Sequence, residues 1–100
     1  MDIKITPSSG NVFTDLGFDE DEAQYLRLRS TLMIEARKLI AEQRLTQVEA
    51  AKLFGVAQPR ISNLVRGRID LFSLDTLVGM LACAGIHVAV VLSPARKGAA

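Results

Sequence analysis

Residues 45–67, LTQVEAAKLFGVAQPRISNLVRG, decide the fold that this chain can adopt. Thr46 suits the N-cap of a helix, and Glu49, three residues later, completes a capping box in which two backbone amides are satisfied reciprocally. Gly55 stands where this helix must end with a positive φ, which a residue without a Cβ adopts at little cost. The sequence therefore predicts a short first helix, and we expect its apolar side to consist of Val48, Ala51 and Leu53.

The second half of the stretch predicts another short helix with one polar face. Pro59 suits its first turn, where no amide partner is lost, and Gly67 ends it. Its inner face consists of Ile61, Leu64 and Val65, and its outer face of Gln58, Arg60, Ser62, Asn63 and Arg66. Two such helices joined by a tight turn form a helix-turn-helix, whose second helix lies in the major groove of DNA. A plain helical hairpin is the alternative, but it needs no polar cluster on that face.

Charge is segregated along the chain, although the 100 residues carry a net charge of only +1. Residues 1–23 hold six acidic side chains and one lysine, whereas residues 44–70 hold five basic side chains and two acidic ones. The basic excess thus coincides with the predicted helix-turn-helix, as phosphate binding requires. At this length we expect one domain with a modest core.

Residues capable of catalysis or metal binding are few. Cys83 is the single cysteine, which excludes an intrachain disulfide framework and is typical of a reducing cytosol; its apolar neighbours predict a buried side chain. His87 is the single histidine and has no cysteine or carboxylate close in sequence to complete a metal site. We therefore expect no catalytic residue, no metal and no cofactor, and we predict that the protein is not an enzyme.

Two segments bear on localisation. Met1–Gly10 lacks the basic start and apolar core of a signal peptide. Leu77–Leu92 is largely apolar, but its sixteen residues fall short of the roughly twenty that span a bilayer, and a core helix followed by a core strand explains it better. The sequence predicts a cytoplasmic protein without a membrane segment.

Hydrophobic periodicity divides the chain into an irregular acidic arm (1–20), a helical domain (21–85), a strand (86–93) and a tail (94–100). A long helix is predicted from about Glu20 to Gln43, with an inward stripe of Leu28, Leu32, Glu35 or Ala36, Leu39 and Ile40, and with Leu26 and Met33 off that stripe. A later helix is capped by Ser73 and ended by Gly85, and its core face consists of Leu74, Leu77, Val78 and Leu81.

Ile86–Leu92 is β-branched, is followed by Ser93-Pro94, and is the one strand that the pattern predicts. A lone apolar strand leaves its backbone donors and acceptors unpaired, which is costly. The simplest remedy is the same strand of a second copy, paired antiparallel across a two-fold axis. We therefore expect a homodimer whose dimerisation residues are Ile86, Val88, Val90 and Leu92.

The 45–67 stretch resembles the phage-repressor-like (Xre) helix-turn-helix family, through its Leu-Thr-Gln opening, its turn glycine, Gln58 and the closing Arg66-Gly67. The resemblance covers roughly residues 32–85. It implies a mainly α bundle of about four to five helices, here with one C-terminal strand. Many members pair an arginine of the first helix with a glutamate late in the second motif helix, where this chain has Ile40 and Val65; an apolar pair is a reasonable replacement.

Side-chain chemistry and the resemblance together predict the DNA contacts. Gln58 and Asn63 can present a donor and an acceptor together to the edge of an adenine, Arg60 can reach guanine or a phosphate, and Ser62 is a weaker base-reading candidate. Gln47 matches a residue that contacts the DNA backbone in the family, and Thr46 begins the same helix. Arg66 and Arg68 flank Gly67, where the chain leaves the groove, and are expected to reach phosphates. The expected ligand is an inverted-repeat operator in double-stranded DNA.

With its acidic arm and C-terminal strand, the chain looks most like antitoxins of bacterial type II toxin–antitoxin operons. The resemblance implies a repressor that autoregulates its promoter and neutralises a small RNA-cleaving toxin. In the arm, Met1–Asp21, acidic charge and Phe13, Leu16 and Phe18 suit a basic protein surface, but these apolar residues can equally pack on the chain's own first helix. The other candidate toxin surface is the outer face of that helix, around Arg27, Arg29 and Arg37. The alternative function is a stand-alone Xre-type operon or phage regulator without a toxin.

Overall fold

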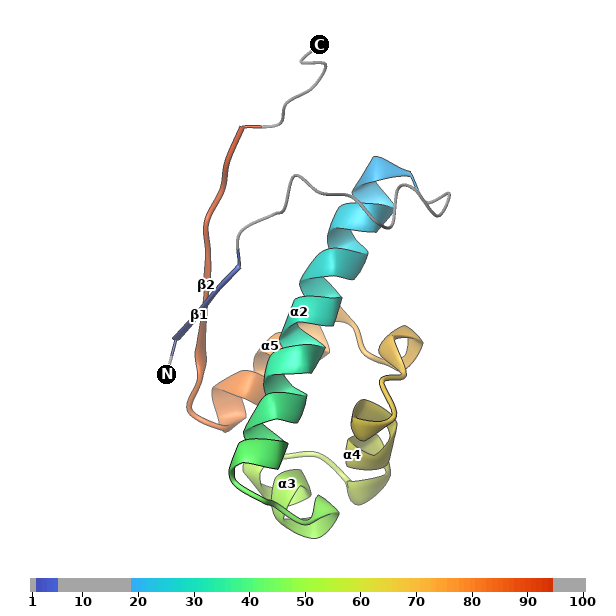
Figure 1. The fold of residues 1–100 in the computed structure, drawn as a ribbon, viewed down its shortest axis with the longest axis vertical. Helices are drawn as coiled ribbons and strands as arrows, with labels where there is room; N and C mark the ends of the chain where they lie inside the picture. Colours follow the sequence, from blue (N-terminus) through green and yellow to red (C-terminus); the bar gives the residue numbers. More distant parts are fainter. Residues whose placement is uncertain (1, 6–18, 95–100) are drawn as a thin grey trace.

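The computed structural model describes residues 2–5 and 19–94, in which four α-helices and one short 3-10 turn are flanked by two strands. Figure 1 shows α3 and α4 gathered at the C-terminal end of the long helix α2. The predicted mainly α helix-turn-helix bundle is confirmed. In chain order the elements are β1 (Asp2–Ile5), α2 (Glu20–Glu42), α3 (Gln47–Phe54), α4 (Gln58–Val65), η1 (Ile69–Leu71), α5 (Leu74–Cys83) and β2 (His87–Val90).

Side-chain capping explains where α2 and α5 begin. The carboxylate of Asp19 accepts a hydrogen bond of 3.0 Å from the amide of Glu22, and the acidic first turn of α2 suits the positive end of the helix dipole. Ser73 caps α5 by accepting from the amide of Thr76 at 3.1 Å, as its sequence predicted. Helix α2 ends at Glu42, one residue before the predicted boundary.

The core lies where α2 crosses the other three helices. The inward stripe of α2 is confirmed, and Ala36 rather than Glu35 is its buried member. Met33 is only 3% exposed, so its predicted place off the stripe was wrong. Leu28 and Ile40 pack partly against this core. Its buried members are Leu32, Met33, Ala36, Leu39, Ala50, Ala51, Phe54, Ile61, Leu64, Phe72, Leu77, Met80, Leu81 and Ile86.

Three valines predicted to face inward are exposed instead. Val48, Val65 and Val78 are 49%, 40% and 38% exposed. In α3 Phe54 is buried instead of Val48, and in α5 Met80 is buried instead of Val78. In helices of eight to ten residues the apolar stripe is wider than the contact, so the docking angle decides which of its members are buried.

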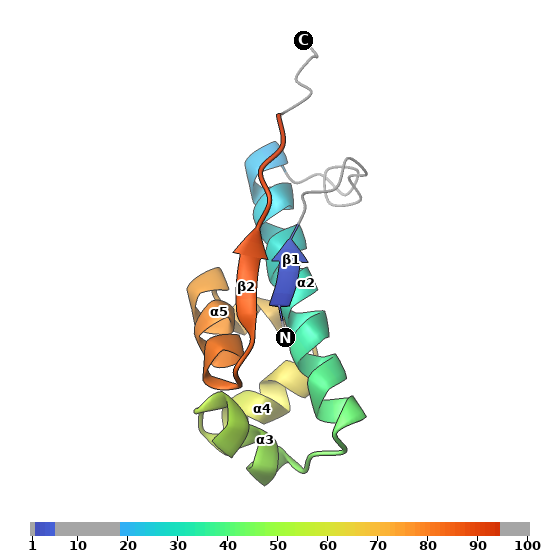
Figure 2. The same cartoon turned by 90° about the vertical axis from the view of Figure 1, so that its left-hand side faces the viewer.

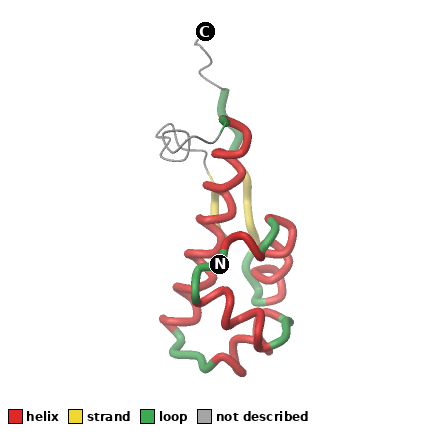
Figure 3. The backbone as a smooth tube through the Cα atoms, turned by 90° about the vertical axis from the view of Figure 1, so that its right-hand side faces the viewer, coloured by secondary structure: helices red, strands yellow, loops and turns green. Residues whose placement is uncertain are grey.

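Strands β1 and β2 pair in parallel, with Asp2 opposite His87 and Ile5 opposite Val90. The prediction of a single strand was therefore wrong, as was the prediction of an irregular chain for residues 2–5. Figures 2 and 3, seen from opposite sides, show both strands on one side of α2 and α5. The premise of the predicted dimer, a strand without an intrachain partner, does not hold. The arm residues Phe13, Leu16 and Phe18 lie outside the described residues.

The C-terminal strand belongs to the core at its beginning and is exposed at its end. Ile86 is buried, and its amide donates to the carbonyl of Leu81 at 2.8 Å; Val88 is half-buried against the core. Farther on, Val90 is 62% exposed and Leu92 is 86% exposed. The apolar segment at 77–92 is thus a core helix followed by a strand, as predicted, but the strand is largely exposed and its predicted place in the core was wrong beyond Val88. None of the described helices has the length and apolarity to cross a membrane.

Candidate nucleic-acid interface

Helix α3 begins with the predicted capping box. The hydroxyl of Thr46 accepts from the amide of Glu49 at 3.1 Å, and the amide of Thr46 donates to the carboxylate of Glu49 at 2.8 Å. The hydroxyl hydrogen of Thr46 remains available as a donor. Thr46 and Gln47 are both exposed, so the N-terminus of α3, with its positive dipole end, is open to an anion.

The turn between α3 and α4 depends on Gly55, which has a φ of 68° and ends α3 in the left-handed region, as predicted. The turn then reaches Ala57, the N-cap of α4, and Pro59 occupies the second position of that helix. A Cβ at Gly55 would lie 2.7 Å from the Sγ of Cys83. Cys83 itself is exposed, so its predicted burial was wrong, but its thiol lies against the turn.

The polar face of α4 follows from the burial of its other face. Ile61 and Leu64 are completely buried, which turns the opposite side of the helix outward. The predicted DNA-contacting residues on that side differ in exposure: Gln58 and Arg66 are exposed, whereas Ser62 and Asn63 are half-buried. All four therefore keep polar atoms on an accessible helix face that can approach base edges or phosphates.

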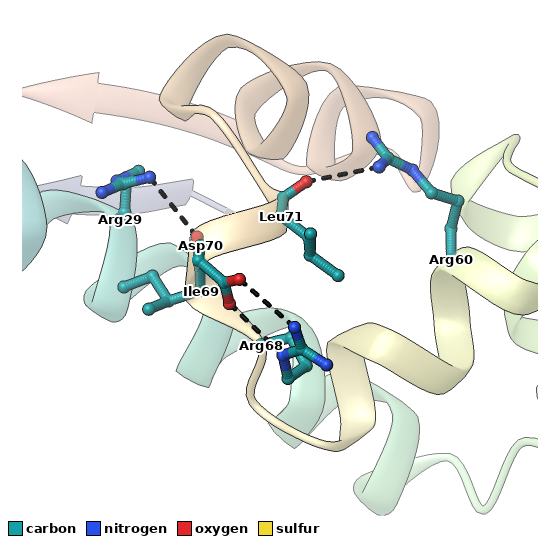
Figure 4. Close-up of polar contacts among 6 residues, drawn as sticks. All are labelled: Arg29, Arg60, Arg68, Ile69, Asp70 and Leu71. Carbon is teal, nitrogen blue, oxygen red and sulfur yellow. Dashed lines mark hydrogen bonds and ion pairs between the residues drawn. The ribbon is translucent and has the colours of Figure 1, made fainter.

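Arg60, the remaining predicted base-reading residue, is held by the segment after α4. Its Nη1 donates to the carbonyl of Leu71 at 3.3 Å (Figure 4). Its guanidinium also lies 4.9 Å from the centroid of the Phe72 ring. Phe72 is buried, so the ring is a fixed platform. In this conformation Arg60 links α4 to η1, and its Nε and Nη2 are the donors that this hydrogen bond leaves for another acceptor.

The end of α4 carries a basic group on each side of Gly67, whose φ is 75°. Arg66 and Arg68 are both exposed, as phosphate contacts require. Arg68 donates through Nε and Nη2 to the two carboxylate oxygens of Asp70, both at 3.3 Å (Figure 4). The hydrogen bond from Arg68 lowers the pKa of Asp70. Arg68 therefore already holds an anion, for which a phosphate must compete.

Arg29 of α2 has a structural role that sequence analysis missed. Its Nη1 donates to the carbonyl of Ile69 at 3.3 Å (Figure 4) and to that of Phe72 at 3.2 Å. Its guanidinium lies 4.9 Å from the ring centroid of Tyr25. Arg29 is half-buried, so its assignment to an outward-facing protein-binding surface was wrong. No sequence signal could have shown this, because its partners are backbone carbonyls some forty residues away.

Ile40 and Val65 lie on the same groove between α2 and α4, as expected of the two positions that often carry an ion pair. The groove has a volume of about 430 Å³ and is lined by Ile34, Arg37, Lys38, Ile40, Ala41 and Val65. Val65 is 40% exposed, so this apolar pair lines an open surface and is not buried. In the described part of the chain no group of three His, Cys, Asp or Glu side chains could hold a metal ion.

Comparison with known proteins agrees with this geometry. The helix-turn-helix domain family matches residues 12–93. A solved structure assigned to the XRE family of transcriptional regulators superposes with a TM-score of 0.69 at 25% identity, covering 79% of this chain and 89% of that one. No curated protein matches the chain. With a capped α3, a left-handed glycine turn and a polar outer face on α4, the chain belongs to the helix-turn-helix domain family.

Proposed function

We propose that this protein is a sequence-specific DNA-binding repressor of the XRE type. The observation that carries the proposal is the arrangement of α4, whose apolar side is fully buried while its polar side is turned outward. The open N-terminus of α3 and the arginines around Gly67 flank that side. This is the arrangement that places one helix in the major groove and a donor or cation at each adjoining phosphate backbone.

Each polar residue has a defined part in this complex. The amides of Gln58 and Asn63 read adenine edges, and Ser62 makes a supporting base contact. Arg60 reads a base through the nitrogens that are not bonded to Leu71. The DNA backbone is contacted by Thr46, Gln47, Arg66 and Arg68, which set the register of α4 in the groove.

The repressor acts as a homodimer on an inverted-repeat operator. One edge of β2 is occupied by β1, and among the described residues no strand lies on its other edge. Because Ile86 and Val88 serve the core of their own chain, the dimer contact falls on the backbone of that edge and on exposed Val90 and Leu92. An antiparallel pair across a two-fold axis then presents two copies of α4 to half-sites about 34–36 Å apart.

The partner that we propose is a small RNA-cleaving toxin, which makes the protein an antitoxin. Support comes from the resemblance to such antitoxins and from the acidic charge of residues 1–23, because an enzyme that binds RNA offers a complementary basic surface. The acidic residues that continue from the arm into α2, Glu20, Asp21 and Glu22, are exposed. The alternative is a stand-alone regulator with the same DNA contacts and no toxin.

Two measurements test the proposal. The full chain is first used to select duplexes from a random pool, and we expect an inverted repeat whose affinity falls steeply with salt. Failure to select any duplex would overturn the DNA-binding proposal. The chain is then co-expressed with its neighbouring reading frame: co-purification and loss of RNA cleavage support the antitoxin, whereas operator binding without a partner identifies the stand-alone regulator.

A further inference from the structure

A positively charged side chain of α2, Arg37, lies beside Gly67, just after the end of α4. Arg37 is exposed, and its Nη1 lies 3.4 Å from the position that a Cβ on Gly67 would occupy. A side chain at residue 67 would be in van der Waals contact with this guanidinium, and the φ of 75° disfavours one. Arg37 therefore lies directly beside the turn that separates Arg66 from Arg68, although it is thirty residues away in the sequence.

Among the described residues, the side chains around Gly67 and the neighbouring turn of α2 include more cations than anions. The cations are Arg37, Lys38, Arg66 and Arg68, and the anions are Glu35 and Asp70. Asp70, the acid at this turn, is bonded to Arg68, and Glu35 on α2 lies 3.6 Å from Lys38. Neither Arg37 nor Arg66 has an ion pair in the described part of the chain. Two guanidinium groups are thus free to bind an added anion, and guanidinium groups match the oxygens of a phosphate.

Arg37 also lines the groove between α2 and α4. Its remaining lining is Ile34, Lys38, Ile40, Ala41 and Val65, which includes no carboxylate. An arginine stem can lie along such an apolar wall while its charged end stays in water. The wall therefore holds the side chain near Gly67 without supplying a counter-charge.

We propose that Arg37 is a further contact to the DNA backbone, forming with Arg66 a two-cation clamp on a phosphate next to the end of α4. The inference rests on the proposed DNA binding and extends it to a helix outside the helix-turn-helix motif. The clamp fixes where α4 ends along the groove. It carries no base preference, because a phosphate is the same at every sequence.

The test compares Arg37→Gln with Lys38→Gln, which removes one positive charge from the adjacent position. Both are measured on a duplex that the native chain selects from a random pool. We expect Arg37→Gln to reduce the slope of log K against log salt by about one unit, equally for operator and variant sequences. Lys38→Gln, which lies beside Glu35, should leave the slope unchanged, and Arg37→Lys should retain it.

Duplexes with single neutral methylphosphonates then locate the contact. One neutral substitution should weaken the native chain and the Lys38→Gln variant but have no further effect on Arg37→Gln. Thermal unfolding of both variants should match the native chain, since both side chains are exposed. If Arg37→Gln behaves as Lys38→Gln on a selected duplex, the clamp is wrong and the proposed function stands. If the native chain selects no duplex, both are wrong.

Discussion

The guanidinium of Arg60 lies over the buried ring of Phe72, 4.9 Å from its centroid. Together with Arg29, which donates to the carbonyls of Ile69 and Phe72, it connects α4 and α2 to the segment between α4 and α5. The orientation of α4 therefore depends on two arginines that contact η1 and Phe72 from α2 and α4.

We predict that Arg60→Ala lowers the free energy of unfolding by about 1 kcal/mol, because it removes both the hydrogen bond to Leu71 and the ring contact. Urea unfolding of the variant measures this. Arg66→Ala is the matched control on the same helix and should stay within about 0.5 kcal/mol of the native chain. Unchanged stability combined with a relaxed base preference would instead make Arg60 a base contact in its resting conformation.

We predict that Asn63→Ala relaxes the preference at one operator position by about 1–3 kcal/mol, because an amide can bond both polar groups of an adenine edge. The measurement is the affinity for a set of operators that each differ at a single base pair. Gln58→Ala should relax a different position, since Gln58 lies at the other end of α4. Equal weakening on every operator would remove Asn63 from base reading.

We predict that Asp70→Asn raises operator affinity about two- to five-fold, because Arg68 is released from its bidentate partner. The lowered pKa of Asp70 keeps this pair intact down to pH values below the usual carboxyl range, and protonation breaks it as the pH falls through that pKa. Near neutrality the effect should therefore be constant with pH.

Asp75→Asn is the control for this comparison, because it removes the same charge from the first turn of α5. Asp75 has no ion pair among the residues that the structure describes. It should raise affinity less than Asp70→Asn. Equal gains would show that only net charge matters and that Arg68 does not reach the DNA.

We predict that Leu92→Asp dissociates the homodimer without unfolding the chain, because Leu92 is 86% exposed and does not pack in the hydrophobic core. Sedimentation at several concentrations, together with urea unfolding, measures both properties. Ser93→Asp places the same charge one residue farther along, at a position that has no apolar side chain to lose, and should leave the dimer intact. A dimer that survives Leu92→Asp would place the interface elsewhere.

We predict that Gly55→Ala lowers the free energy of unfolding by at least about 1–2 kcal/mol, the usual cost of the left-handed region for a residue with a Cβ. The new Cβ also meets the Sγ of Cys83, so a Cys83→Ala background should recover part of the loss. Gly79→Ala is the opposite case: it has open space and lies within α5, and it should stabilise the chain by about 0.5–1 kcal/mol.

Features set by neighbours in sequence could be predicted from the sequence, and features set by docking could not. Thr46, Glu49 and Ser73 cap their helices through residues three positions away, so the pattern shows them directly. Val48 and Val65 were misassigned because the docking angles of short helices decide burial. The partners of Arg29 and Arg60 depend on where η1 lies, which no local pattern encodes.

The first strand was missed for a related reason. Asp2–Ile5 alternates polar and apolar residues over only four positions, which is too short to distinguish from an irregular arm. Its pairing with β2 is parallel and joins segments more than eighty residues apart, so no local sequence pattern indicates this pairing. The same difficulty applies to Arg37 and Gly67, which meet only because α2 and α4 pack together.

The parallel pairing of β1 and β2 also sets an order for events on the ribosome. Synthesis produces β1 first, yet its hydrogen-bonding partner is made only after all four helices. Until β2 has been made, residues 2–5 lack their folded partner, while the helices, whose contacts are nearer in sequence, can already associate. The sheet can therefore close only after β2 has been made, and until then the backbone groups of residues 2–5 lack the partners that β2 supplies.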